Sequence, residues 1–187
     1  MSKYEILINL FTVVYGILLM DLFASLHKII RARRIIKWHW LPLLSSWYLF
    51  LLIIKNWWDI AIPEVALKEY SIIRFVVYGH LLFLIFLLVS TVLPDDVKKR
   101  GICLKEYYFQ NHRYFWGLMS IVGLISILNS EVPKIIHDSP INMYNIIANM
   151  FFLSLTVLLA LIKKYWVHSV LLIFFTIITL IEIVQAI

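Results

Sequence analysis

Residues 75–93 read FVVYGHLLFLIFLLVSTVL and contain no charged side chain. A helix needs about 20 mostly apolar residues to cross the hydrocarbon core of a bilayer. Further apolar runs of comparable length precede and follow this one. The sequence therefore predicts an all-α polytopic membrane protein, a bundle of six transmembrane helices over residues 4–27, 41–60, 70–93, 113–128, 143–162 and 165–186.

The composition agrees with a membrane protein. The 187 residues are 63% hydrophobic and 15% charged, and their mean hydropathy is +0.90. Soluble domains average roughly 45–50% apolar and about 25% charged residues. The predicted helices occupy most of the chain, so residues 1–187 are expected to form a single transmembrane domain with no soluble domain attached.

Most of the 17 Lys and Arg residues lie in alternate gaps between the predicted helices. Basic residues are retained on the cytoplasmic side of a membrane. The first, third and fifth gaps are therefore predicted inside, and both termini outside. Anionic lipid headgroups are the expected partner of this cytoplasmic face, and a cytoplasmic protein is the alternative. The face comprises Arg31, Arg33, Arg34, Lys37, Lys98, Lys99, Arg100 and Lys105.

Each inward gap ends on basic residues, aromatics and a histidine. The three instances are KWHW at 37–40, HRYFW at 112–116 and KYWVH at 164–168. Such residues are typical of a membrane interface, and a threefold repeat of helical hairpins is the alternative. Residues 95–112 mix basic and aromatic side chains, so we expect a short helix that lies in the interface.

Two ionisable residues fall inside predicted spans. Asp21 lies near the inner end of the first helix, and His80 lies near the middle of the third. Intramembrane ionisable groups are candidates for proton or ion handling. The alternative is that each side chain only bonds to a neighbouring helix. Asp21 and His80 are the candidate intramembrane polar site.

A second polar group is expected at the outer side. Lys55 and Asp59 are four residues apart and can pair along one helix. Arg74 and Glu182 lie at similar depth, so the four residues would form an outer polar cluster if their helices adjoin. The alternative is that these long charged side chains do not contact one another and simply extend to the lipid headgroups.

Motifs of metal, nucleotide and redox enzymes are missing from the sequence. Four of the six histidines lie at similar depth, but no HxxxH or HExxH spacing occurs. No Walker loop, GxSxG or CxxC motif occurs, and Cys103 is the single cysteine. We expect no cofactor, no metal and no nucleic acid as partner, and we favour a non-enzymatic role.

The run from Asp21 to Leu44, DLFASLHKIIRARRIIKWHWLPLL, resembles small bacterial integral membrane proteins of unassigned function. These proteins share an aliphatic first helix, an arginine-rich turn and a second helix that opens with Trp-x-Trp-Leu-Pro-Leu-Leu. The resemblance implies the bacterial inner membrane and no particular activity. The sequence thus favours a structural, sensing or partner-docking component, with homo-oligomers an open question. The alternative is a small transporter or channel with a path through Asp21 and His80.

Overall fold

The computed structural model describes residues 3–61, 72–95, 101–136 and 143–185. These parts of the chain form six helices and one pair of two-residue strands. The helical fold class is confirmed. The elements are α1 Lys3–Arg31, β1 Ile36–Lys37, α2 Trp40–Ala61, α4 Ile72–Val92, β2 Ile102–Cys103, α5 Leu104–Ile136, α6 Met143–Leu161 and α7 Tyr165–Gln185.

Four of the helices are long and apolar enough to cross a membrane. The sections that qualify are Ile8–Arg31, Phe75–Val92, Met143–Leu161 and Tyr165–Gln185. Helices α2 and α5 are not among them. Charged and amide residues, Lys55, Asn56 and Asp59, follow the apolar part of α2, and the first turns of α5 are polar.

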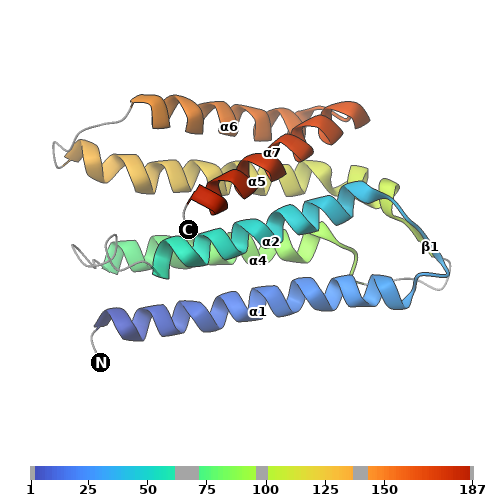
Figure 1. The fold of residues 1–187 in the computed structure, drawn as a ribbon, viewed down its shortest axis with the longest axis horizontal. Helices are drawn as coiled ribbons and strands as arrows, with labels where there is room; N and C mark the ends of the chain where they lie inside the picture. Colours follow the sequence, from blue (N-terminus) through green and yellow to red (C-terminus); the bar gives the residue numbers. More distant parts are fainter. Residues whose placement is uncertain (1–2, 62–71, 96–100, 137–142, 186–187) are drawn as a thin grey trace.

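The helices lie side by side along the long axis of the molecule (Figure 1). Helix α5 packs against α4 and α6, and α2 packs against α1, α4 and α7. Helix α7 crosses the bundle obliquely. The strands β1 and β2 and the turn from α6 to α7 lie at one end, and both chain termini lie toward the other. The basic residues Arg31, Arg33, Arg34, Lys37 and Lys105 lie at or beside the first end, which is called the basic end below.

The core runs through the middle of the bundle, and apolar side chains also cover much of its outside. Trp116, Phe175 and Leu88 are almost completely buried. By contrast, Met20 and Val184 are 65% and 70% exposed. Large exposed aliphatic side chains on helices whose backbone is internally hydrogen-bonded suit lipid as the surrounding solvent.

Helix α5 is longer than the sequence predicts, and this corrects two expectations. It starts at Leu104, whereas the predicted span covers residues 113–128 with a separate interfacial helix over 95–112. Leu104, Tyr108 and His112 recur every four residues and are all buried. This spacing gives the first turns of α5 one buried face. Residues 104–112 are therefore the start of a single long helix that packs in the bundle, and not a separate interfacial helix.

The short parallel pairing of β1 with β2 is a second feature that the sequence does not predict. Ile36 is paired with Ile102 and Lys37 with Cys103. Gly101, just before β2, has a φ of 80°, and a Cβ there would collide with the backbone carbonyl of Ile35. Only glycine combines this φ with so close an approach. The pairing joins the α1–α2 connection to the start of α5 at the basic end.

Candidate functional site

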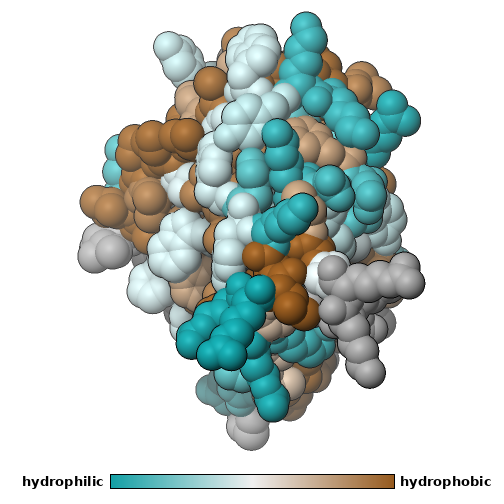
Figure 2. Space-filling model, turned by 90° about the vertical axis from the view of Figure 1, so that its right-hand side faces the viewer, coloured by the Kyte–Doolittle hydropathy of each residue, from teal (hydrophilic) through white to brown (hydrophobic). Residues whose placement is uncertain are grey.

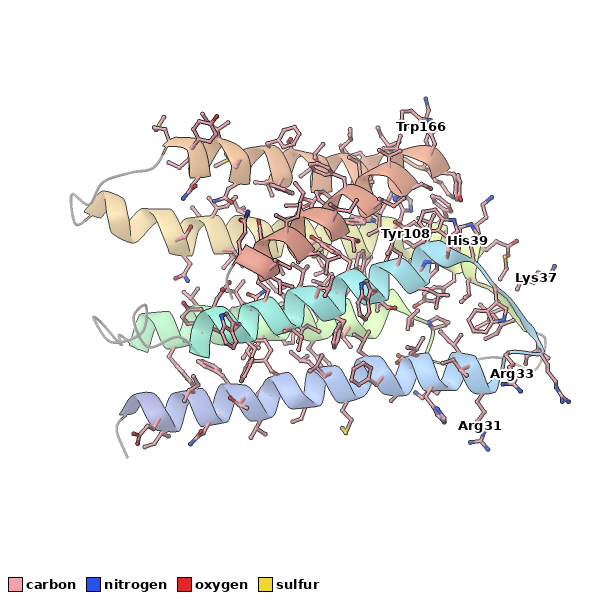
Figure 3. All side chains as sticks on the ribbon, in the orientation of Figure 1. Arg31, Arg33, Lys37, His39, Tyr108 and Trp166 are labelled. Carbon is pink, nitrogen blue, oxygen red and sulfur yellow. The ribbon has the colours of Figure 1, made fainter. Side chains whose placement is uncertain are left out.

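The basic end carries exposed positive charge. Arg31, Arg33 and Lys37 are exposed there (Figure 3). No ion pair joins them to a carboxylate within the parts of the chain that the structure describes. Figure 2 looks onto this end and shows hydrophilic side chains beside pale ones of intermediate hydropathy and brown apolar ones. Lys98, Lys99 and Arg100 lie outside the described residues.

The segments KWHW at 37–40, HRYFW at 112–116 and KYWVH at 164–168 are called the basic-aromatic motifs below. Aromatic side chains from the first and third of them meet at the edge of the basic end. Trp40 Nε1 donates a hydrogen bond to Tyr165 Oη at 2.8 Å. The His39 ring lies 5.6 Å from the Tyr165 ring, and Lys105 Nζ lies 5.2 Å from the centre of that ring. The start of α2 is thus tied to the starts of α5 and α7 by ring contacts and a cation–π contact.

His39 is a neutral member of this surface. Burial and the nearby Lys105 ammonium lower the pKa of His39 from its ordinary value. Its Nδ1 accepts a hydrogen bond from the backbone N–H of Leu41 at 3.3 Å, which caps the start of α2. The positive charge of the basic end therefore comes from Lys and Arg rather than from His39.

Residues from the second and third motifs meet deeper in the bundle around one oxygen atom, Tyr108 Oη. Trp116 Nε1 donates to this oxygen at 3.0 Å, and the same hydroxyl is 2.9 Å from His168 Nδ1. His168 Nε2 is 2.7 Å from the carbonyl oxygen of Ile162. We call Tyr108, Trp116 and His168 the buried triad.

The hydrogen bonds of the buried triad assign its protons. A carbonyl oxygen only accepts, so His168 Nε2 carries a hydrogen and donates it to Ile162. In a neutral ring Nδ1 is then an acceptor, and it takes the hydrogen of the Tyr108 hydroxyl. That oxygen accepts from Trp116 in turn. His168, on α7, thus bonds with one ring nitrogen to the α6–α7 turn and with the other to Tyr108 on α5, so both of its nitrogens are occupied.

His112 lies beside the buried triad, with its ring centre 5.5 Å from that of His168. Its Nδ1 is 2.8 Å from the carbonyl oxygen of Phe109 and donates to it. Its Nε2 is buried without a hydrogen-bond partner among the described residues. Within these same residues, no three His, Cys, Asp or Glu side chains gather in a way that could hold a metal ion.

The candidate intramembrane residue His80 lies on the outside of the bundle. Its side chain is exposed, beside the exposed apolar side chains of Val76 and Phe83. Its Nδ1 is 2.7 Å from the carbonyl oxygen of Val76 in the previous turn and donates to it. Nδ1 of His80 therefore has its hydrogen-bond partner within α4 itself. The His80 ring does not face the interior of the bundle.

Asp21 is half-buried on α1, about one turn before Ser25. Ser25 is fully buried, and its Oγ donates to Asp95 Oδ1 at 3.1 Å, just beyond the end of α4. Asp21 lies one turn from this contact on α1, whereas the His80 ring faces outward from α4. The structure does not bring Asp21 and His80 into one polar site.

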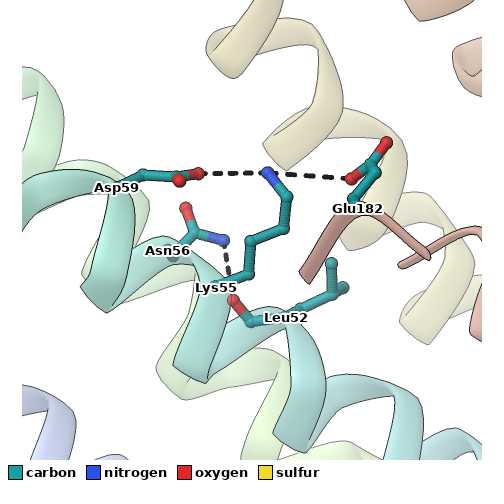
Figure 4. A network of polar contacts seen from close by, with 5 residues as sticks. All are labelled: Leu52, Lys55, Asn56, Asp59 and Glu182. Carbon is teal, nitrogen blue, oxygen red and sulfur yellow. Dashed lines mark hydrogen bonds and ion pairs between the residues drawn. The ribbon is translucent and has the colours of Figure 1, made fainter. Parts of the chain in front are cut away.

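Three residues of the expected outer cluster do lie together, at the end opposite the basic end (Figure 4). Lys55 Nζ is 3.1 Å from Asp59 Oδ2 and 3.7 Å from Glu182 Oε2. The ammonium group thus lies between a carboxylate of its own helix and one of α7, since α2 and α7 pack against each other. The side chain of Arg74 lies outside the described residues.

No protein-family model matches this chain, and no curated protein or solved structure matches it at a significant level. The resemblance to small bacterial membrane proteins therefore stays a prediction. The function is inferred below from the geometry of the chain itself.

Proposed function

We propose that the chain is a multi-pass protein of the bacterial cytoplasmic membrane that binds anionic lipid headgroups through its basic end. In this proposal all six helices span the bilayer, and both termini face out. The observation that carries the proposal is the gathering of exposed Arg and Lys side chains, without a carboxylate partner among the described residues, at the end where the α1–α2 and α6–α7 connections lie.

The surroundings of these charges suit a membrane interface. Trp38, Trp40 and Trp166 are 46%, 38% and 64% exposed at the same end. Indole rings favour the headgroup level of a bilayer, and Lys and Arg side chains favour its cytoplasmic face. A basic surface beside such a ring of aromatics attracts anionic headgroups, with about 1 kcal/mol for each basic residue near the surface.

A structural or docking role fits this geometry better than transport through Asp21 and His80. A proton or ion path needs polar groups that follow one another through the bundle interior. His80 faces outward from α4, away from the bundle interior. A cytoplasmic protein is the competing partner for the basic end, and its capture with the purified chain would favour docking over lipid binding.

The full chain in lipid nanodiscs tests the proposal. We expect a higher unfolding temperature in discs of phosphatidylcholine with phosphatidylglycerol than in phosphatidylcholine alone, because the anionic headgroups bind the folded state. The difference should shrink as sodium chloride is added, since exposed charges are screened over about 10 Å at 0.1 M salt. Equal unfolding temperatures in both discs at low salt would refute lipid binding.

A further inference from the structure

A cavity of about 370 Å³ lies between α2, α5, α6 and α7, toward the end opposite the basic end. Helix α7 starts close to α6 and ends close to α2, so α6 and α7 diverge along their length (Figure 1). The cavity lies where they diverge. Polar side chains on all four helices line it: Asn56, Ser126, Asn149, Thr156, Thr179 and Glu182.

One wall of the cavity is aromatic. The rings of Tyr48 and Phe175 stack at 5.9 Å, and Phe152 lies 5.7 Å from Phe175. Tyr48, Phe175 and Thr179 are all buried. A mainly apolar cavity of some 300–1,000 Å³ with a few converging polar groups is typical of a small-molecule site.

The charged side chains at the mouth of the cavity determine which sign of charge a bound molecule should carry. Glu182 lines this cavity and also a neighbouring one of about 600 Å³, which Lys55, Trp58 and Asp59 help to line. The described charged side chains around the two cavities are two carboxylates and one ammonium. Their side chains are 31–55% exposed. The excess negative charge favours a cation and disfavours an anion.

We propose that this cavity binds a small organic monocation that enters from the end opposite the basic end. Its ammonium group lies against Glu182, and its apolar body packs on Tyr48, Phe152 and Phe175. The Glu182 carboxylate lies 3.7 Å from the Lys55 ammonium, which Asp59 also pairs. The charge of Glu182 is therefore only partly balanced, and the carboxylate keeps affinity for a second ammonium group. This site is distinct from the lipid-binding surface and goes beyond the function proposed above.

Three probes that differ only at the head group test the proposal: 2-phenylethylammonium, neutral 2-phenylethanol and anionic 3-phenylpropionate. Binding is measured by calorimetry with the full chain in phosphatidylcholine nanodiscs, and binding to empty discs is subtracted. We expect the cation to bind at least about tenfold more tightly than either analogue, because a charged hydrogen bond contributes roughly 1.5–3 kcal/mol. Equal binding of the cation and the alcohol, or no binding of the cation, would overturn the proposal.

Two pairs of variants locate the site. Glu182→Gln should weaken cation binding about tenfold, whereas Asp21→Asn, the same change on α1, should leave it unchanged. Gly123→Leu fills the cavity and should abolish binding, because a Cβ at Gly123 meets only Leu153 at an ordinary 3.7 Å. Gly117→Leu is the control on the same helix, since Gly117 does not line the cavity.

Wild-type affinity in both Glu182→Gln and a correctly folded Gly123→Leu would contradict the assignment of the site. Circular dichroism and size exclusion establish the folding of each variant. If Gly123→Leu does not fold, the binding of the three probes to the wild type and to Glu182→Gln is sufficient to test the proposed cation site. A failure of cation binding leaves the lipid measurement untouched, because the two sites lie at opposite ends of the bundle.

Discussion

Replacing Tyr108 by Phe should destabilise the folded protein by about 2–4 kcal/mol, because one hydroxyl group serves two buried partners. Trp116 and His168 are both 0% exposed, and Tyr108 is 5% exposed. The phenylalanine ring keeps the packing but removes the acceptor of the Trp116 N–H and the donor to His168 Nδ1. Each buried polar atom left unpaired costs about 1–3 kcal/mol.

Thermal unfolding in detergent, followed by tryptophan fluorescence, measures the effect. For a chain of this size, 1 kcal/mol lowers the melting temperature by about 2–4 °C. Tyr114→Phe removes the same hydroxyl from an exposed position on the same helix and should change the melting temperature very little. If both variants melted together with the wild type, the buried triad would not contribute to stability.

Neutralising the arginine-rich turn should weaken the binding of phosphatidylglycerol roughly a hundredfold. The variant is Arg31→Gln, Arg33→Gln, Arg34→Gln, in which three exposed charges are lost together. Each basic residue near an anionic surface contributes about 1 kcal/mol, and about 1.4 kcal/mol corresponds to tenfold in affinity. Native mass spectrometry with defined lipid mixtures gives the affinity of each protein.

A charge-retaining variant is the control for this prediction. In Arg31→Lys, Arg33→Lys, Arg34→Lys the charge stays the same, while the planar guanidinium groups are lost. Near wild-type affinity in the lysine variant and loss in the glutamine variant would show that charge carries the binding. Unchanged affinity in the glutamine variant would mean that the lipids bind elsewhere on the protein.

The sequence predicts helices well where hydropathy alone decides, and poorly where a partner helix decides. The apolar runs at 143–162 and 165–186 match α6 and α7 closely. The start of α5 at Leu104 could not be predicted, because the first turns of that helix are polar overall. Their buried stripe is recognisable only once α7 and the α6–α7 turn lie against it.

The same reason explains the mixed outcome for the candidate sites. Lys55 and Asp59 follow a local spacing of four residues, and their pairing needs no knowledge of the fold. The outward orientation of His80 depends on which face of α4 meets its neighbours. The buried triad depends on the order of the helices, since Tyr108 and His168 are 60 residues apart in the chain. The three basic-aromatic motifs can be recognised in the sequence as separate segments. The contacts between them cannot be predicted without the arrangement of the helices.

Cysteine accessibility decides whether the basic end faces the cytoplasm. In a Cys103→Ser background, Arg33→Cys places one thiol at the basic end, and Asn145→Cys places one near the start of α6 at the opposite end; both positions are exposed. With a membrane-impermeant maleimide, we expect labelling of Asn145→Cys in intact cells, and of Arg33→Cys only after permeabilisation. Labelling of Arg33→Cys in intact cells would contradict it.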